Sequence, residues 1–368
     1  MRLLEVKQVK VNQVLGRTIY NERNQVLLGE GVVLTEKLLQ RLEDLGISFI
    51  YVQDEHIVPE STITNQLRRT TIQSMEKLFK NIGESKELAS TYFLMDRASK
   101  DFKALIRYIS DEIKKSEELL TIMTDVYILD SYIFTHSLNV TLYSLAIGLE
   151  LKLEQKQLEI LGLGAMLHDV GKLNVSKDIL NKPGKLTDDE YKEIKEHAEN
   201  GFRILKDVST LPLLVAHCAY QHHERLDGSG YPRGINGQDI HLFGKIIAVA
   251  DVFDAVTSNR VYRRAMLPHE GLEILYAGSG TLFDQSIIEA FRKSVAIYPI
   301  GLTVTLSDYR IGVVSKQNHG SSDRPFVHII RERDQVLSES YELNLLDHLD
   351  ITIIGCHKED SNDWSFAN

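Results

Sequence analysis

The sequence predicts a mainly α fold, in which a large helical domain lies between a small α/β domain at the N-terminus and a short β-rich extension at the C-terminus. Three observations predict this fold. Short β-prone segments surround one helical segment near the N-terminus, apolar residues recur at three- and four-residue spacing through the middle, and strand-like alternation returns near the C-terminus. The length of 368 residues is enough for two or three domains.

The small α/β domain is predicted over residues 1–60. Its strand candidates are RTIYN, QVLLGEGVVL and SFIYV, and its helical segment begins at Thr35 and ends at Gly46. Residues 61–124 continue with helical periodicity, in segments such as TIQSMEKLFKNI and DFKALIRYISDEIKK. No clean heptad repeat runs through them, so we predict a helical linker or stalk.

The main helical domain is predicted over residues 125–297, where HSLNVTLYSLAIGLE and GKIIAVADVFDAVTS place apolar residues at helical spacing. The β-rich extension follows over residues 298–368. Its strand candidates are IGLTVTLSD, RIGVVSKQN, PFVHIIRE and LDITIIG. The middle block is therefore the body of the protein.

Composition excludes several classes of protein. The formal net charge of -10 argues against a general nucleic-acid binder or a binder of anionic membranes. The two cysteines, Cys218 and Cys356, are far apart, so neither a disulfide framework nor a zinc knuckle is indicated. The N-terminus lacks the apolar core of a signal peptide, and no run of about 18 apolar residues predicts a membrane span. We therefore expect a cytoplasmic protein.

The stretch GAMLHDVGKLNV places His168 and Asp169 side by side at the end of an apolar helical run. A buried pair of this kind costs free energy unless something compensates its polarity. A metal ion, a proton relay and an ordinary hydrogen-bonded core pair are the three explanations.

Other imidazoles and carboxylates share this apolar helical context. Each alone is more often a satisfied core residue or a helix cap than a ligand. Asp251 resists that interpretation, because KIIAVADVF is apolar on every side. Seven such groups in one domain favour shared metal ions, which satisfy many nitrogens and carboxylates together. The seven are His136, His168, His197, His222, His223, Asp169 and Asp251.

The donor types narrow the choice of metal. Imidazole and carboxylate without thiolate suit iron, manganese, zinc or nickel, and seven groups exceed what one tetrahedral zinc takes. Two metals are therefore expected, with Asp169 as the bridge between them. Two metals about 3.5 to 4 Å apart that share an acidic bridging water or hydroxide are suited to displacement at phosphorus.

Five stretches of the middle block, in order and spacing, resemble the HD-GYP subgroup of the HD phosphohydrolase superfamily. They are HDVGK at 168–172, ILNKPGKLTDDE at 179–190, HHERLDGSGYP at 222–232, ADVFDAVTSNRVYR at 250–263 and SGTLFD at 279–284. The resemblance implies a helical domain that hydrolyses cyclic di-GMP, a bacterial second messenger, to the linear dinucleotide pGpG and in many members onward to GMP. It also implies that the seven residues above are the metal ligands.

The resemblance further implies contacts to the substrate. Lys172 resembles the family lysine at the scissile phosphate, and its ammonium would offset developing negative charge; its alternative role is to complement a helix dipole. Arg260 and Arg263 match positions that bind the second phosphate or a guanine edge, unless they form a solvated cluster. Asp130 and Asp254 match acidic positions that hydrogen-bond water or substrate.

Two further features bear on metals and partners. Tyr132 occupies the position where some members carry a glutamate that binds a third metal, so two ions, iron or manganese, are expected here. In the family, the glycine-rich loop around Gly230, Tyr231 and Pro232 is credited with substrate access and with contacts to diguanylate cyclase (GGDEF) domains. A rigid surface turn is the alternative. The stalk is also compatible with a homodimer.

The sequence thus predicts a metal-dependent phosphodiesterase in which Asp169 and Lys172 are catalytic and the hydroxide is held by the metals. Alternatives are a hydrolase acting on another cyclic dinucleotide or on a nucleotide monoester, a receptor that binds cyclic di-GMP without cleaving it, and a diiron redox enzyme. The complete ligand set argues against a receptor. The basic pair and the glycine-rich loop favour a phosphate substrate over redox chemistry.

Overall fold

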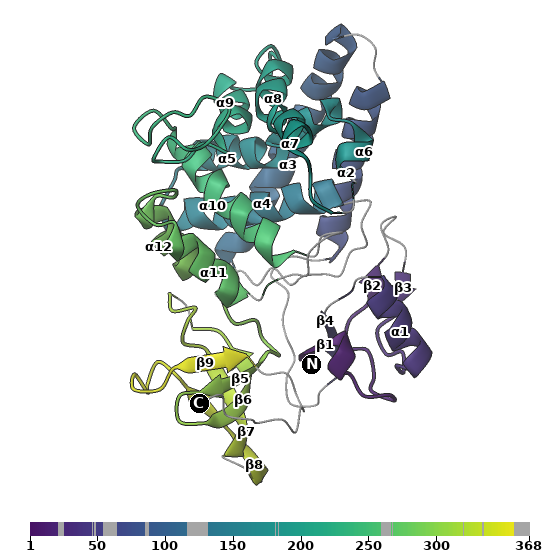
Figure 1. Ribbon diagram of the computed structural model, residues 1–368, viewed down its shortest axis with the longest axis vertical. Coiled ribbons are helices and arrows are strands. Elements are labelled where there is room, and N and C mark those ends of the chain that lie inside the picture. Colours follow the sequence, from purple (N-terminus) through teal and green to yellow (C-terminus); the bar gives the residue numbers. More distant parts are fainter. Residues whose placement is uncertain are drawn as a thin grey trace. The chain divides into compact units, whose positions relative to one another are not determined.

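The computed structural model describes residues 1–20, 26–45, 47, 49–53, 65–84, 88–115, 132–180, 182, 184–258, 266, 268–318, 320–332 and 335–356. The chain divides into two units (Figure 1). One contains the described residues up to 53 together with those from Ala296 onward, and the other contains the described residues from 65 to Val295.

The N-terminal part of the first unit is a small α/β arrangement. Strand β1 (Arg2–Glu5) pairs antiparallel with β4 (Phe49–Val52), and β2 (Ile19–Tyr20) pairs antiparallel with β3 (Val26–Leu28). Helix α1 (Glu36–Asp44) begins after Thr35, whose hydroxyl accepts the Leu38 N–H at 3.3 Å as an N-cap. The predicted strands and helix are confirmed here, whereas β1 was not predicted.

The C-terminal part of the first unit is a five-stranded antiparallel sheet in the order β8-β7-β6-β5-β9. The Leu3 N–H in β1 donates to the Gly301 carbonyl at 2.9 Å. This bond joins the N-terminal part of the unit to its C-terminal part. The strands are β5 (Thr303–Leu306), β6 (Arg310–Lys316), β7 (Phe326–Glu332), β8 (Gln335–Asn344) and β9 (Ile353–Cys356).

The second unit is helical, which confirms the mainly α prediction. Short turns and loops join its helices, including the 3-10 helix η3 (Val170–Asn174). The α-helices are α2 (Asn65–Glu84), α3 (Leu88–Lys115), α4 (Tyr132–Glu150), α5 (Gln155–Leu167), α6 (Lys177–Leu180), α7 (Asp188–Lys195), α8 (His197–Leu205), α9 (Leu213–Gln221), α10 (Leu242–Thr257), α11 (Pro268–Ala277) and α12 (Gln285–Ser294).

Helix α4 forms the centre of the helical unit. Residues 136–148 are all buried, and α4 packs against α2, α3, α5, α10 and α12 (Figure 1). A helix that is covered on every side has no face for charged side chains, and α4 has no Asp, Glu, Lys or Arg before Glu150 at its end. Helix α10 also packs on α4, and this contact brings two chemically important helices together.

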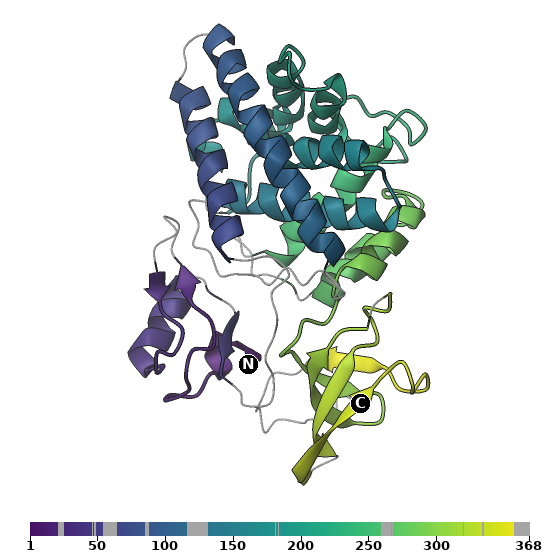
Figure 2. The same ribbon diagram turned by 180° about the vertical axis from the view of Figure 1, so that it is seen from behind.

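Helices α2 and α3, which lie in the segment predicted as a linker or stalk, belong to the helical unit and pack against its other helices. Figure 2 shows them side by side along it, in blue. Met75 and Phe79 of α2 and Phe102 and Ile106 of α3 are buried. These helices cover α4 and α5 and so contribute to the same core. None of the helices described has the length and apolar character that a bilayer crossing requires.

Candidate metal centre

Seven imidazole and carboxylate side chains meet inside the helical unit, and they come from the ends or middles of several elements. His136 lies on α4, Asp251 lies on α10, and His197 is the first residue of α8. The remaining four follow helix ends: His168 and Asp169 after α5, and His222 and His223 after α9. The structure thus brings together all seven residues that the sequence proposed as metal ligands.

A close backbone crossing makes this convergence possible. Gly171 in η3 lies against the carbonyl of His197 and the N–H of Gly201 in α8, and a Cβ at residue 171 would overlap that carbonyl. Only glycine fits such an approach. The crossing places His197 opposite the His168–Asp169 pair.

Asp169 lies at the centre of the group and faces two ways. Its Oδ2 is 3.3 Å from His168 Nε2 and 3.6 Å from His136 Nε2. Its Oδ1 is 3.4 Å from His197 Nε2 and 3.9 Å from His222 Nε2. One carboxylate thus has an oxygen directed at each of two sets of imidazoles.

The histidine rings are held so that the same nitrogen points inward. Nδ1 of His168 donates to the Ala165 carbonyl at 2.7 Å, and Nδ1 of His197 donates to the Ile194 carbonyl at 2.7 Å. Nδ1 of His222 donates to the Ala219 carbonyl at 2.8 Å. Because a carbonyl only accepts, each Nδ1 carries a proton, so Nε2 is the nitrogen that is bare when the ring is neutral.

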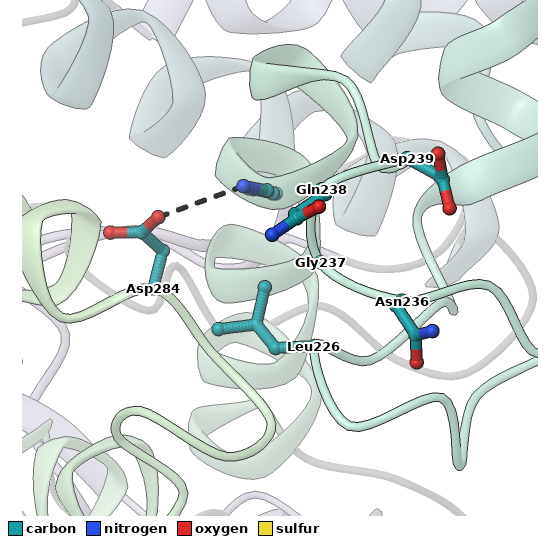
Figure 3. Close-up of a pocket in the computed structure, with 7 residues that line it drawn as sticks. Leu226, Asn236, Gly237, Gln238, Asp239 and Asp284 are labelled. Atoms are coloured by element: carbon teal, nitrogen blue, oxygen red, sulfur yellow. Dashed lines mark ion pairs between the residues drawn. The ribbon is translucent and has the colours of Figure 1, made fainter.

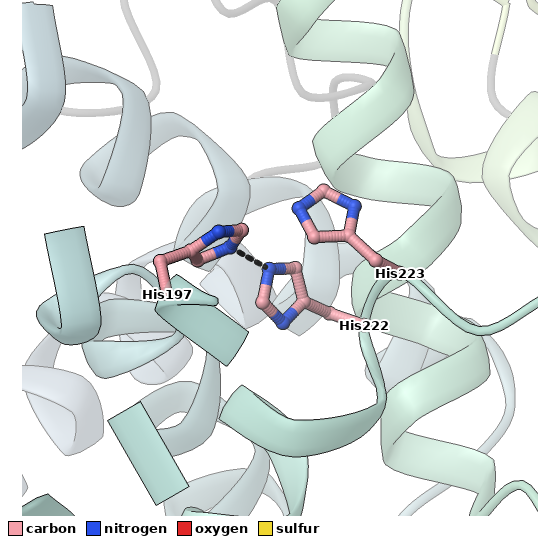
Figure 4. A group of neighbouring side chains, drawn as sticks. All are labelled: His197, His222 and His223. Carbon is pink, nitrogen blue, oxygen red and sulfur yellow. Dashed lines mark hydrogen bonds between the residues drawn. The ribbon is translucent and has the colours of Figure 1, made fainter. Parts of the chain in front are cut away.

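Two observations indicate that these bare nitrogens are suited to a cation. The Nε2 atoms of His197 and His222 are 3.2 Å apart (Figure 4), and two lone pairs at that distance repel unless a cation lies between or beside them. His168 Nε2 and Asp169 Oδ1 are buried and have no hydrogen-bond partner among the described residues. A divalent ion would satisfy both kinds of atom.

Three overlapping groups of donors have the spacing of a metal site, with all donor atoms of a group within 4.8 Å of one another. Nitrogen and carboxylate oxygen are the donors that divalent transition metals take in proteins. The residues present therefore fit a divalent metal. The groups are His197, His222 and His223; His136, His168 and Asp251; and His168, Asp169 and His222.

The electrostatics of the imidazoles favour neutral rings. Burial lowers the pKa of His197 to about 4. It also holds the pKa values of His222 and His223 well below the usual imidazole value. Neutral imidazole is the form that binds metals, so these three rings are in the binding form at neutral pH.

The carboxylates are ionised. Burial opposes the charge of Asp169, but His168 and Lys172 outweigh it and hold the pKa of the carboxyl well below its ordinary value. Burial also opposes the charge of His136, yet hydrogen bonds to carboxylates, first that of Asp251, raise its pKa to about 9. The carboxylates therefore make the His136 side of the site attractive to a cation.

Asp254 lies behind His136 and is almost fully buried. Its Oδ2 accepts the Nδ1–H of His136 at 2.7 Å, and its Oδ1 accepts from Asn139 at 2.8 Å and from Ser258 at 3.1 Å. Both oxygens are thus engaged within the protein, whereas the sequence suggested a contact to water or substrate. A carboxylate in this place fixes the tautomer of a metal-binding histidine.

Asn139 and Glu224 were not singled out from the sequence, although both hold parts of the site in place. Glu224 follows the histidine pair, and its carboxylate accepts the N–H groups of Arg233 and Ile235 at 2.9 and 3.1 Å. These bonds close the glycine-rich loop onto α9. The signal available in the sequence for Glu224 was an acidic residue directly after the predicted ligands His222 and His223.

The glycine-rich loop places an aromatic ring on the metal centre. The Tyr231 ring stacks on His223, with centroids 4.6 Å apart and an interplanar angle of 27°. The Tyr231–Pro232 peptide bond is cis. Gly230 runs so close to the backbone of Glu224 and Arg225 that a Cβ would clash there. The loop predicted to govern substrate access thus lies directly beside His223.

Only some of the other residues predicted to contact the substrate lie among the described residues. Lys172 Nζ donates to Asp169 Oδ2 at 2.5 Å, and its side chain is 21% exposed. Arg260, Arg263 and Asp130 lie outside the described residues. Tyr132 begins α4.

A pocket of about 580 Å³ is lined mainly by residues of the same loop (Figure 3). None of the seven candidate ligands lines it. The Lys245 ammonium at its edge is 3.8 Å from the Asp284 carboxylate. Its lining residues are Leu226, Asn236, Gly237, Gln238, Asp239, Lys245 and Asp284.

Comparison with known proteins identifies the helical unit. A family model described as HD domain matches residues 84–287, which contain all seven candidate ligands. The chain belongs to the HD domain family. The resemblance found in its sequence is thereby confirmed, and the matched range includes His168 and Asp169.

Curated relatives of this HD domain protein are phosphodiesterases by name. A cyclic di-GMP phosphodiesterase of Pseudomonas aeruginosa is 34% identical over 267 residues, 72% of this chain and 64% of the relative. A 3′3′-cGAMP-specific phosphodiesterase of Vibrio cholerae is 40% identical over 168 residues, 46% of this chain and 36% of the relative. A cyclic di-GMP phosphodiesterase of Thermotoga maritima is 34% identical over 209 residues, 56% of this chain and 55% of the relative. The chain spans less than two thirds of each relative's length.

Proposed function

We propose that this chain is a metal-dependent phosphodiesterase that hydrolyses cyclic di-GMP to pGpG and onward to GMP. The observation that carries the proposal is the position of Asp169, whose two oxygens each face a set of imidazole nitrogens. That arrangement suits a pair of cations at a phosphate ester. The names of the relatives support the choice of substrate.

The proposed cofactor is a pair of divalent ions, iron or manganese. His136, His168 and Asp251 would hold one, and His197, His222 and His223 the other, with Asp169 between them. A set of seven nitrogen and oxygen donors exceeds what one tetrahedral zinc takes. When bound, such ions polarise phosphoryl oxygens and make water a nucleophile at neutral pH.

The exposed edge of the site indicates where a phosphate enters. Side-chain exposure is 21% for Lys172 and 18% for His223, whereas it is 2% or less for His136 and His222. The ammonium of Lys172 at this edge can offset negative charge that develops on the phosphate oxygens. The buried remainder of the site keeps its dipoles fixed and excludes bulk water.

Other parts of the proposal concern residues and partners beyond the centre. Arg260 and Arg263 are proposed to bind the distal phosphate or a guanine edge, and Asp130 to hydrogen-bond water or substrate. A cytoplasmic location, a homodimer and a diguanylate cyclase partner at the glycine-rich loop belong to the same proposal. The exposure of Ser229 and Arg233 in that loop is compatible with a protein partner.

Another cyclic dinucleotide is the second candidate substrate. The 3′3′-cGAMP-specific relative from Vibrio cholerae, at 40% identity, is the observation that favours it. Both substrates share the phosphodiester and differ in one base. The same assay therefore distinguishes them.

The test combines elemental analysis of the purified protein with hydrolysis of cyclic di-GMP and 3′3′-cGAMP after reconstitution with Fe²⁺ or Mn²⁺. We expect about two metals per chain and faster turnover of cyclic di-GMP. Asp169→Ala should lose most bound metal and lower activity by several orders of magnitude, with helical circular dichroism retained. Asp111→Ala on the exposed face of α3 is the matched control. Tight binding of cyclic di-GMP without cleavage in any metal form would make the protein a receptor instead.

A further inference from the structure

The rim of the metal centre carries an aromatic and cationic surface that the proposed mechanism does not use. It is formed by Tyr191 and Lys195 of α7 and by Tyr231 of the glycine-rich loop. Lys195 Nζ lies 4.9 Å from the centroid of the Tyr191 ring and 5.9 Å from that of Tyr231. The ammonium is therefore within cation–π distance of both tyrosines.

This surface adjoins the chemistry directly. Tyr231 stacks on His223, a candidate metal ligand, at 4.6 Å between centroids. One aromatic ring therefore separates Lys195 from the metal centre. A base attached to a phosphate bound at that centre would extend over the same rim.

Helix α7 is held rigidly in the orientation that presents these side chains. Thr187 caps it by accepting the Glu190 N–H at 3.3 Å. The Glu190 carboxylate binds Lys182 at 2.7 Å, and Glu193 accepts the Ser176 N–H at 3.2 Å. Tyr191 and Lys195 are four residues apart and so lie on one face of the helix.

Lys195 also lacks an anionic partner in the part of the chain that the structure describes, and its ammonium lies beside the two tyrosine rings. The acids of α7 are engaged elsewhere, since Glu190 pairs with Lys182. Tyr191 is 48% exposed, so its ring is accessible to a ligand. An exposed ring beside an unpaired ammonium is suited to a flat ligand with acceptor atoms.

The geometry points to a guanine subsite in which Tyr191 stacks on the base and Lys195 donates to its O6 and N7. Guanine presents two acceptors on that edge, whereas adenine places an amino donor beside N7 and would face the ammonium with like polarity. Lys195 is thus assigned as a specificity-determining residue. This inference rests on the proposed function, because it assumes a cyclic dinucleotide at the metal centre.

The decisive variant is Lys195→Gln, because glutamine suits the N6 and N7 edge of adenine. The measurement is the ratio of kcat/KM for cyclic di-GMP to kcat/KM for cyclic di-AMP, using the full metal-loaded chain. We expect the variant to lower this ratio by about tenfold or more. Lys192→Gln, on the exposed side of the same helix, should keep the ratio of the parent.

Tyr191 is tested through KM. Tyr191→Ala should raise KM for cyclic di-GMP by about tenfold, the size of effect expected when one base–aromatic stack is lost, with a smaller change in kcat. Tyr191→Phe should restore most of the loss, because the ring stacks and the hydroxyl does not. Tyr108→Ala, at a helical position that is 49% exposed, is the control.

The base-free substrate bis(p-nitrophenyl) phosphate distinguishes a failure of the guanine subsite from a failure of the proposed function. The fall in kcat/KM caused by Tyr191→Ala should be larger for cyclic di-GMP than for this ester. If the parent cleaves cyclic di-GMP but Lys195→Gln keeps its base ratio, the guanine subsite is wrong and the proposed function stands. If the parent cleaves the ester but no cyclic dinucleotide, both are wrong.

Discussion

At the scale of single residues, the hydrogen bonds behind the ligands decide what the site can bind. Three imidazoles donate Nδ1–H to backbone carbonyls three residues earlier, and His136 donates to Asp254. In the three rings that donate to carbonyls, Nε2 is therefore the nitrogen that faces the centre and binds a metal when the ring is neutral. Each ring orientation is therefore fixed by the fold before any metal arrives.

Asp254→Ala tests this dependence. Loss of the carboxylate removes the partner that fixes the His136 ring, so we expect metal affinity to fall about 10- to 100-fold. Titration of the metal-free protein with Mn²⁺ measures it. Asn139→Leu should give a smaller decrease, because Asn139 reaches His136 through Asp254. Parental affinity in Asp254→Ala would show that His136 is positioned by α4 alone.

The sequence predicted which side chains are candidate ligands, but it did not predict which other side chains lie beside them. The seven candidate ligands were found from the sequence, because imidazole and carboxylate in apolar helices are costly without compensation. Asn139 was not found, since the partner that gives it a role, Asp254, lies 115 residues away in the chain. Tyr191 and Lys195 were not singled out from the sequence, because Tyr231, which completes their surface, is distant from them in the chain.

At the scale of elements, close crossings and tethers hold the helices that carry the ligands. Helical periodicity identified α4 and α10, but it could not show that η3 and α8 touch at Gly171. Strand β8 was missed, because Ser338, Glu339 and Ser340 interrupt its apolar alternation. Edge strands tolerate such sequences, and β8 is at the edge of its sheet.

Gly171→Ala tests the crossing of η3 and α8. The added Cβ would overlap the His197 carbonyl, so the two elements must separate. We expect the free energy of unfolding to fall by about 1 to 3 kcal/mol, as it does when a core is overpacked. Urea unfolding followed by circular dichroism measures it. Gly29→Ala is the control, because nothing lies within 4 Å of its Cβ position. Unchanged stability in Gly171→Ala would mean that the backbone there shifts without cost.

A carboxylate on α3 tethers the loop between α8 and α9. Asp96 accepts the Thr210 hydroxyl at 2.7 Å and the Thr210 N–H at 3.1 Å, and these bonds lower the pKa of its carboxyl. A folded pKa below the unfolded value of about 3.9 means that the stabilisation is complete above that value. It is lost as the pH falls through the folded pKa.

Asp96→Asn should therefore be less stable than the parent at pH 7, and the difference should shrink as the pH falls below about 4. Urea unfolding of both proteins at several pH values measures the difference. Asp111→Asn, on an exposed position of the same helix, should track the parent at every pH. A difference that stays constant down to pH 3 would mean that the charge of Asp96 does not contribute.

At the scale of the whole molecule, each unit has its own core. The helical unit is built around α4, and the other unit buries Leu306, Val313 and Val327 in the C-terminal sheet. Sequence periodicity found the helices and most strands, yet it could not show that β1 meets Gly301. That contact joins residues some 300 positions apart, and local patterns carry no information about such pairings.

Separate cores predict separate unfolding. A divalent metal that binds only the folded helical unit should stabilise that unit alone, by about 2.7 kcal/mol at a free concentration one hundred times its Kd. Leu306→Ala empties a fully buried position of the sheet and should lower the stability of the other unit by about 2 to 5 kcal/mol. Calorimetry with and without Mn²⁺ should show two transitions, of which the metal raises one and Leu306→Ala lowers the other. A single transition that responds to both changes would mean that the units unfold together, and the metal would then stabilise the whole chain.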